Sequence, residues 1–495
     1  MVSSTDAGHG PGDDAAHLAS LGYTSDFKRD MSLWGNFSLG FTYLSPVVGV
    51  YSLFAFAIAA GGPPMIWAIV LAAIGQLLVA LVFGEVVAQF PVSGGVYPWA
   101  RRLWGRKWAW MTGWIYIAAL VITIASVTYG AGPFVAMLFG AQPSTDVTIL
   151  CAVALIAIVT ALNFGGTKLL ARVAFFGFAA EIAGAIVVGG WLLLTERRHG
   201  LGVLFDPSGA QGSGSYLPAF LASALIGVYL FYGFEACGDV AEEVKNPGLQ
   251  IPKAMRMTIY IGGAGAFFIT LGLILAVPDF SAVISGADPD PVTTVLQDAF
   301  GTVGFKFVLA VVLISFLSCA LSLQAAASRL IYSYSRDDMM PGSALFKRFS
   351  PTRHVPPYAL VLAALVPTVI VVGSKISENA LTKIISFAAL GIYLGFMMVV
   401  FAALRARLNG WKPSGRFTLG AWGLPVTVAA LTYQLLAVTN MAWPRTPDAP
   451  WYDNYIVLLS AAAVVVIGVV YMLIAKPYLR ADVAHGDAVR QDVHE

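Results

Sequence analysis

Three of the acidic residues inside the long apolar stretches of this sequence are candidates for chemistry: Glu181, Glu235 and Asp239. A charged side chain at the centre of a membrane costs about 2.5–3.5 kcal/mol on insertion scales, so such residues usually mark a functional site. Glu235 is a candidate for pairing with a cationic ligand group or for exchanging a proton; alternatively, it accepts backbone N–H groups and braces its own segment. Glu181 is a candidate proton-exchange group, because it is expected to be buried; alternatively, hydrogen bonds hold it in a structural role.

Aromatic residues precede Glu235 in the same stretch. Tyr229 lies six positions before it and Tyr232 three positions before it. The face of a tyrosine ring attracts an ammonium group, an interaction worth about 0.5–2 kcal/mol. Tyr229 is therefore a candidate for contacting an amine, and Tyr232 for lining the same pocket. The alternative for both residues is ordinary packing inside the protein.

The sequence offers no constellation for catalysis or metal binding. Cys151, Cys237 and Cys319 are far apart, all six histidines lie outside the apolar stretches, and there is no HExxH motif. We therefore predict no catalytic residue, no metal site and no cofactor, and a protein that is not an enzyme.

The composition identifies the class of protein. Of 495 residues, 58% are apolar and only 11% are charged, whereas soluble domains have about 25% charged residues. So few charges do not cover the surface of several soluble domains. The formal net charge of +2 indicates no basic surface for nucleic acid. The lipid bilayer is the expected environment.

Twelve apolar stretches are long enough to cross a bilayer. Backbone groups in lipid need internal hydrogen-bond partners, so each stretch is predicted to be helical. The expected fold is an all-α polytopic membrane protein. The predicted spans are 33–60, 65–90, 108–139, 146–164, 171–194, 216–241, 255–277, 303–334, 356–373, 380–404, 419–440 and 454–475.

The Lys and Arg residues predict the orientation in the membrane. With the N-terminus in the cytoplasm, 23 of the 29 Lys and Arg residues fall on the cytoplasmic side. We expect cytoplasmic tails at 1–30 and 476–495 around a transmembrane domain at 31–475. The remaining six residues fall on the other face: Arg197, Arg198, Lys306, Lys375, Lys383 and Arg445.

Two of the predicted spans are interrupted. Pro46 breaks the first span, because proline lacks a backbone donor, and Gly233 and Gly238 flank Glu235 in the sixth. Broken helices at matching places in two halves are typical of secondary transporters. This pattern favours two inverted five-helix repeats, at 33–194 and 216–404, followed by extra helices at 419–475. A simple proline kink with glycine-mediated packing is the alternative.

Three segments resemble the amino acid–polyamine–organocation (APC) transporter superfamily. Residues 231–254 carry a glycine–aromatic–acid core followed by Glu-Glu-Val-Lys-Asn-Pro and Ile-Pro-Lys-Ala. Residues 84–97 (GEVVAQFPVSGGVY) look like the end of the superfamily's second helix, and residues 329–341 (RLIYSYSRDDMMP) like its eighth-helix exit. The resemblance extends from about residue 30 to residue 475. It implies a LeuT-like five-plus-five fold and a transport function.

The resemblance also implies roles for individual residues. Many members carry Gly-Ser-Gly in the first helix, where free amides receive a substrate carboxylate; here these positions are Val47, Val48 and Gly49, beside Ser45. This departure is similar to the amino acid/choline branch, which includes GABA and choline permeases. Tyr229 matches an aromatic residue that closes over the substrate in many members. Glu181 matches a lysine of some proton-coupled members and an acid of ethanolamine-permease-like sequences.

Acidic residues also follow the interruption of the sixth span. Asp239 lies one helical turn beyond Glu235. Glu242 and Glu243 come next, and we expect them to pair with basic residues such as Arg101 or Arg336. Asp239, Glu242 and Glu243 are thus candidates for an inner gate; the alternative is a solvated cluster of charges.

These observations predict a secondary active transporter of the plasma membrane, or of the inner membrane if the source is bacterial. The expected substrate is a small amino acid or amine, in the class of GABA, choline, ethanolamine, polyamines and amino acids. Transport would couple to protons or occur by exchange. The alternatives are a non-transporting nutrient sensor of the same fold and a polytopic membrane enzyme.

Overall fold

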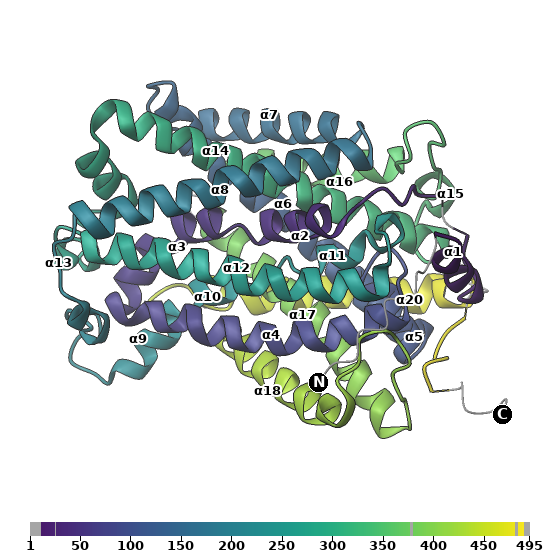
Figure 1. The fold of residues 1–495 in the computed structure, drawn as a ribbon. Helices are drawn as coiled ribbons and strands as arrows, with labels where there is room; N and C mark the ends of the chain where they lie inside the picture. The colour runs from purple at the N-terminus through teal and green to yellow at the C-terminus, as the bar shows by residue number, and fades with distance from the viewer. Residues whose placement is uncertain (1–10, 25, 377–379, 481–483, 490–495) are drawn as a thin grey trace, which may run out of the picture.

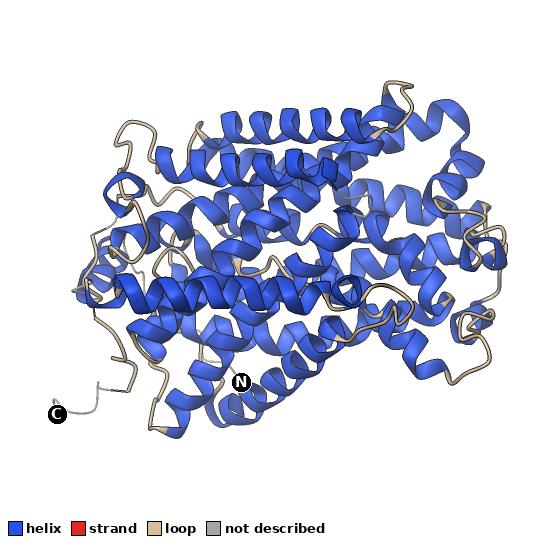
Figure 2. Ribbon diagram, turned by 180° about the vertical axis from the view of Figure 1, so that it is seen from behind, coloured by secondary structure: helices blue, strands red, loops and turns tan. Residues whose placement is uncertain are grey.

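The computed structural model describes residues 11–24, 26–376, 380–480 and 484–489. This part of the chain consists of helices and loops and contains no strand (Figure 2). The predicted all-α class is therefore confirmed. The α-helices are α1 (Pro11–Ser20), α2 (Leu33–Leu44), α3 (Pro46–Gly61), α4 (Ile66–Gln89), α5 (Val96–Leu103), α6 (Arg106–Leu138), α7 (Thr145–Asn163), α8 (Thr167–Thr195), α9 (Tyr216–Ser223), α10 (Leu225–Leu230), α11 (Ala236–Asp239), α12 (Pro247–Ala276), α13 (Phe280–Ile284), α14 (Pro291–Arg336), α15 (Ser343–Phe346), α16 (Pro357–Gly373), α17 (Ala380–Leu408), α18 (Gly423–Ala442), α19 (Trp451–Asn454) and α20 (Ile456–Ala475).

Short 3-10 helices complete the secondary structure. They join or extend the α-helices at several loops. They are η1 (Pro63–Met65), η2 (Leu201–Phe205), η3 (Ala241–Glu243), η4 (Ser374–Ile376), η5 (Gly420–Trp422) and η6 (Pro477–Leu479).

Helices account for all twelve predicted spans. Among the described residues, ten helical segments are long and apolar enough to cross a membrane. Two shorter apolar helices, Tyr216–Leu230 and Pro357–Gly373, match the sixth and ninth predicted spans. The polytopic membrane fold is therefore confirmed. The division into repeats at 33–194 and 216–404 stays a prediction.

The spans differ in how much of their surface other helices cover. In their most apolar windows, the α2–α3 segment and α6 are both 72% buried, whereas α7 is 22% buried and α20 only 6%. Figure 1 shows α7 along one edge of the bundle and α2 and α3 in its middle. Because lipid covers apolar side chains as well as protein does, the outer helices keep exposed apolar faces. The central helices are the ones that can enclose a site.

The first interrupted span breaks between α2 and α3, where Pro46 predicted it. Ser45 has a φ of 41°, in the left-handed region, and its N–H donates to the Phe41 carbonyl at 2.7 Å. Pro46 is the first residue of α3, a position where a missing N–H costs little. The chain therefore ends one helix and begins the next within two residues, in a fully buried position.

The second interruption separates α10 from α11. Gly233 has a φ of +111°, and a β-carbon there would lie 2.7 Å from the Leu44 amide nitrogen. At Gly49, a β-carbon would overlap the Leu230 side chain. Only glycine allows the two broken segments to approach this closely. The two interruptions, almost 190 residues apart in sequence, thus face each other in the middle of the bundle.

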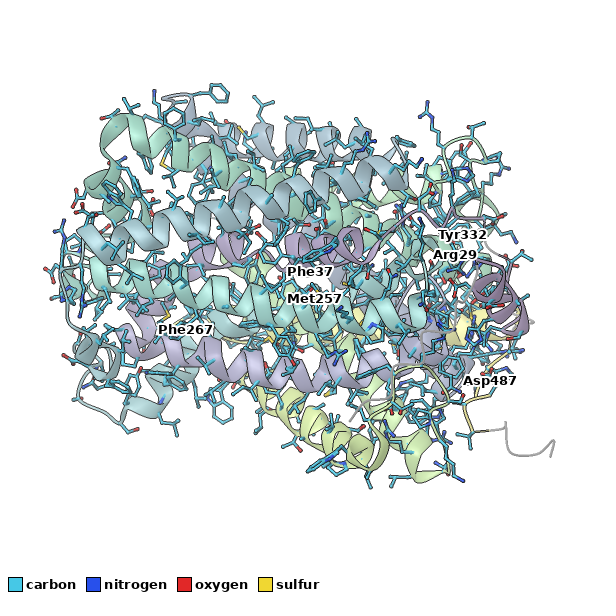
Figure 3. All side chains as sticks on the ribbon, in the orientation of Figure 1. Arg29, Phe37, Met257, Phe267, Tyr332 and Asp487 are labelled. Atoms are coloured by element: carbon cyan, nitrogen blue, oxygen red, sulfur yellow. The ribbon has the colours of Figure 1, made fainter. Side chains whose placement is uncertain are left out.

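Both described ends of the chain lie at one end of the bundle, formed by α1, α5, α15 and residues 484–489, which we call the basic end. The Gly486 amide donates to the Arg101 carbonyl at 2.9 Å, and His17 Nε2 lies 3.0 Å from the Gln89 carbonyl oxygen. Figure 3 labels Arg29, Tyr332 and Asp487 at this same end. The assignment of the basic end to the cytoplasm stays a prediction from the Lys and Arg positions.

Candidate functional site

Glu181, on α8, lies against the break between α2 and α3. Its Oε1 atom accepts hydrogen bonds from Ser45 Oγ and from the Val47 amide, both at 2.8 Å. The side chain is fully buried, and its Oε2 atom has no hydrogen-bond partner within the described chain. A helix N-terminus carries free N–H groups and a partial positive charge. The carboxyl group therefore fits the start of α3 while keeping one oxygen free.

The backbone amides proposed to receive a substrate carboxylate are already occupied. The Val47 amide donates to Glu181, and the Val48 amide lies 3.4 Å from Ser45 Oγ. The Gly49 amide donates to the Ser45 carbonyl at 3.0 Å. A substrate carboxylate would have to displace these internal partners. In this conformation the first break therefore binds the Glu181 carboxyl group.

Glu235 braces the second break. Its Oε1 atom accepts a hydrogen bond from the Tyr116 hydroxyl at 2.7 Å. Its Oε2 atom accepts one from the Gly233 amide, also at 2.7 Å. Both oxygens of this buried carboxyl group therefore have protein donors, one on α6 and one on the interrupted backbone. The bracing alternative for Glu235 matches this geometry.

Asp239 presents the opposite case. Its side chain is fully buried, yet neither carboxyl oxygen has a hydrogen-bond partner among the described residues. The side chain lies against Gly95, where a β-carbon would overlap Oδ1, and the Gly94 amide donates to the Asp239 carbonyl at 3.0 Å. A buried carboxylate without partners is costly, because it has lost its water and gained nothing in exchange. Asp239 therefore has free capacity for a cation or a proton.

Three tyrosine rings gather between the two breaks. The Tyr232 ring packs edge-on against Tyr229, with centroids 5.5 Å apart, and against Tyr43, with centroids 6.1 Å apart. All three side chains are buried. The Tyr43 hydroxyl has no hydrogen-bond partner in the described structure. These rings offer aromatic faces and a free hydroxyl next to the acids of the second break.

The glutamates after the second break form buried ion pairs. Glu242 Oε1 lies 2.9 Å from Arg336 Nη2, and Glu242 also exchanges two 3.1 Å hydrogen bonds with Ser93. Glu243 Oε1 lies 2.8 Å from Arg329 Nε. Both glutamates are fully buried, so the alternative of a solvated cluster is wrong. The pairs instead fasten η3 to α14 and to the loop before α5.

Arg101 has a different partner from the one expected. It forms an ion pair with Asp337 rather than with the two glutamates. Asp337 also accepts hydrogen bonds from Tyr97 at 2.7 Å and from Tyr23 at 3.0 Å. This cluster lies at the basic end, beyond the glutamate pairs. A second layer of buried polar contacts therefore closes the bundle there.

Several residues of this site were not predicted from the sequence. Tyr43 carried a signal, because it lies two residues before Ser45 in the first interrupted stretch. Tyr116 carried none, because it lies in the long apolar run of α6, and only the fold brings it to Glu235. Asp337 lies inside the segment that resembled an eighth-helix exit, but its partner is on α5.

Cysteines near the breaks have packing roles. Cys319 Sγ contacts the Tyr43 carbonyl at 3.3 Å, and Cys237 Sγ contacts the Asn36 carbonyl at 3.4 Å. The two contacts hold opposite ends of α2 against its neighbours. Across the described ranges, no group of three or more His, Cys, Asp and Glu residues is placed to hold a metal ion.

Comparisons with known proteins agree with this architecture. A family model described as amino acid permease matches residues 31–471. The amino-acid permease BAT1 homolog of Oryza sativa subsp. japonica is 27% identical, over 90% of this chain and 91% of that protein. The amino-acid permease BAT1 of Arabidopsis thaliana is 26% identical, over 92% and 93%. A putative polyamine transporter of Candida albicans is 24% identical, over 88% and 82%.

The family match spans both interrupted helices, the ion-pair layer and the outer spans. It confirms the resemblance to the APC superfamily and the prediction that the protein is a permease and not an enzyme. The chain belongs to the amino acid permease family.

Proposed function

We propose that this protein is a secondary active transporter that moves a small amino acid or amine across the plasma membrane by alternating access. The observation that carries the proposal is the meeting of two broken helices, with Gly233 packed on Leu44, next to buried acids on both sides. Broken helices supply unpaired backbone groups and dipole ends at the middle of a membrane. Amino-acid permeases and a putative polyamine transporter among the relatives support the same class of substrate.

The substrate group bound at the second break is proposed to be a cationic amine. Tyr43, Tyr229 and Tyr232 provide aromatic faces, and Asp239 provides a carboxyl group with no partner of its own. Because Glu235 is engaged by Tyr116 and Gly233, we assign it to positioning the break. The ammonium group would then pass from the tyrosines towards Asp239 as the site opens to the basic end.

Glu181 is proposed to couple transport to protons. Protonation removes the negative charge that holds the start of α3, which weakens the bonds from Ser45 and the Val47 amide. The Ser45 hydroxyl and the Val47 amide then become available to substrate. Release of the proton restores the original contacts. Substrate exchange without net proton movement is the alternative mode, and it would use the same site.

The ion pairs Glu242–Arg336 and Glu243–Arg329 are proposed to form the inner gate. Glu242 and Glu243 follow Asp239 in the chain, on the side of Asp239 towards the basic end. Opening to the basic end requires the ion pairs to separate. Glu242, Glu243 and Arg329 are fully buried and Arg336 is only 15% exposed, which indicates that this conformation is closed at the basic end.

Uptake into liposomes tests the function. Purified protein in proteoliposomes should accumulate at least one labelled substrate from a panel of amino acids, GABA, choline, ethanolamine and polyamines, with saturation. The same ligand should raise the melting temperature of the detergent-solubilised protein, because it binds the folded state. Ligand-induced stabilisation without flux would favour a sensor. The proposal would be contradicted if no member of the panel produced either flux or stabilisation.

Two neighbouring acids should respond differently to loss of their charge. Asp239→Asn breaks no hydrogen bond, so its melting temperature should equal that of the wild type or exceed it. Its Michaelis constant for the amine substrate should rise at least about tenfold, or about 1.4 kcal/mol. Glu235→Met removes both acceptor oxygens and leaves the Tyr116 hydroxyl and the Gly233 amide unpaired, which should cost about 1–3 kcal/mol of stability.

Thermal unfolding and initial uptake rates measure the two effects, and each variant is the control for the other. An Asp239→Asn protein with normal affinity would remove Asp239 from the substrate path. Equal destabilisation by both changes would contradict the different roles assigned to them.

A further inference from the structure

A cavity of about 670 Å³ lies apart from the helix breaks, at the basic end. Three segments form it: the chain before α2, the connection between α7 and α8, and the loop before α16. Its lining includes Lys28, Lys168, Arg353, His354, Phe164 and Thr167.

The cavity carries an excess of positive charge. Asp30 is the one carboxylate of its lining, and Lys28 and Lys168 share it at 3.4 Å and 4.0 Å. The two lysine side chains are 57% and 68% exposed, so their ammonium groups can contact a further anion. Arg353 has no carboxylate partner in the described ranges, and its guanidinium lies over the Phe164 ring at 6.0 Å. Three cations against one acid leave two positive charges for a ligand.

The backbone adds hydrogen-bond donors to this charge. α8 begins at the cavity, directly after Gly165 and Gly166, and no side chain caps its first turn. Gly166 has a φ of +82° and packs against the Arg353 carbonyl, which joins the two loops. Uncapped amides at the start of a helix suit an anion such as a phosphate.

The position of the cavity distinguishes a lipid from a soluble anion. Lys168 is the second residue of α8, and Lys28 lies five residues before α2, so both are at the edge of the membrane spans. α7 and α8 are mostly uncovered by protein, at 22% and 33% buried in their most apolar windows. Two turns into α8, Phe175 and Phe176 are exposed. A phosphate bound in the cavity would therefore have acyl chains beside it.

We infer that this cavity binds the headgroup of an anionic phospholipid. Basic pockets between membrane helices on the cytoplasmic side suit such headgroups. The site is also connected to the ion-pair layer, because Thr167 donates a hydrogen bond to Glu243, the partner of Arg329. A bound headgroup holds the start of α8 in place and thereby stabilises the closed arrangement of Glu243. The binding step is independent of the proposed function; only the effect on the gate rests on it.

The test compares two double variants with equal loss of charge. Lys168→Gln/Arg353→Gln removes cations of the cavity. Lys412→Gln/Arg480→Gln removes one lysine and one arginine outside its lining. Phosphatidylglycerol should raise the melting temperature of the wild type and of the second variant, and the first variant should lose most of this shift. Phosphatidylcholine should have little effect on any of the three proteins.

A further arm separates the lipid from its soluble headgroup. Glycerol 3-phosphate and inorganic phosphate should give little stabilisation at concentrations where phosphatidylglycerol acts. Equal shifts from inorganic phosphate, or equal phosphatidylglycerol shifts in both double variants, would overturn the inference. Because the readout is thermal stability, failure of the transport proposal would leave this result unaffected. If the wild type takes up substrate more slowly in phosphatidylglycerol liposomes than in phosphatidylcholine liposomes, and Lys168→Gln/Arg353→Gln does not, the link to the gate is supported. Equal uptake rates of the wild type in the two lipids would contradict that link.

Discussion

The Arg329→Met variant should lose about 3–5 kcal/mol of stability, because it leaves a charged glutamate buried without its partner. Arg329 and Glu243 are both fully buried, and Arg329 Nε and Nη2 contact the carboxylate at 2.8 Å and 3.3 Å. The only other side chain that the structure describes as bonded to Glu243 is Thr167, whose hydroxyl is neutral. Thermal unfolding followed by tryptophan fluorescence measures the loss.

Two further variants separate the lost ion pair from lost packing. Arg329→Met/Glu243→Gln removes both charges and keeps an acceptor for Thr167, so it should recover most of the stability. Arg348→Met changes an exposed arginine at the same end and should stay within about 0.5 kcal/mol of the wild type. If the double variant is no more stable than Arg329→Met, the cost is one of packing, and the buried ion pair is not what closes the basic end.

The position of the first helix break could be predicted from the sequence because its cause is local. Proline removes a backbone donor wherever it occurs, so Pro46 fixes the start of α3. Gly233 is one of several glycines in its stretch, and its sequence neighbours do not show why the second break needs a glycine at this position. The need comes from its φ of +111° and its contact with Leu44, and both depend on the fold.

The partners of the buried acids could not be predicted, because they are distant in sequence. Glu181 meets Ser45 across 136 residues, and Glu235 meets Tyr116 across 119. The sequence made Glu235 and Asp239 look alike, since both are acids in one interrupted apolar stretch. Only the structure separates them, by giving Glu235 two donors and Asp239 none.

The pairings of the charged residues at the basic end could not be predicted from the sequence either. The sequence indicated that Glu242 and Glu243 would meet basic residues, and charge alone allowed several pairings. In the structure Arg336 pairs with Glu242, and Arg101 pairs with Asp337. Which arginine reaches which acid depends on how α5 and α14 pack, and a pattern of charges along one chain does not contain that information.

The Glu181→Gln variant should lose proton-driven accumulation while keeping substrate exchange. Glutamine retains a carbonyl oxygen for Ser45 and the Val47 amide, so the break should keep its geometry. It cannot bind or release a proton at the position of the Oε2 atom, which has no partner in the described chain. If Glu181 carries the coupled proton, the variant still binds substrate but no longer uses the gradient.

Proteoliposomes with the membrane potential clamped at zero measure this loss. A gradient of one pH unit supplies about 1.4 kcal/mol per proton, which limits accumulation to about tenfold for one coupled proton. The wild type should approach this tenfold ratio of internal to external substrate, and the ratio for Glu181→Gln should stay at about one under the same gradient. Counterflow against trapped unlabelled substrate should remain in the variant, which would show that its binding site is intact.

The outcomes distinguish coupling from a structural role. Loss of both accumulation and counterflow, with a lower melting temperature, would indicate that Glu181 only holds α3 in place. Full accumulation by Glu181→Gln would exclude it as the proton carrier. Asp239 would then be the next candidate, because it is the other buried acid of the site with free carboxyl oxygens. Combining Asp239→Asn with the same gradient experiment would decide between the two acids.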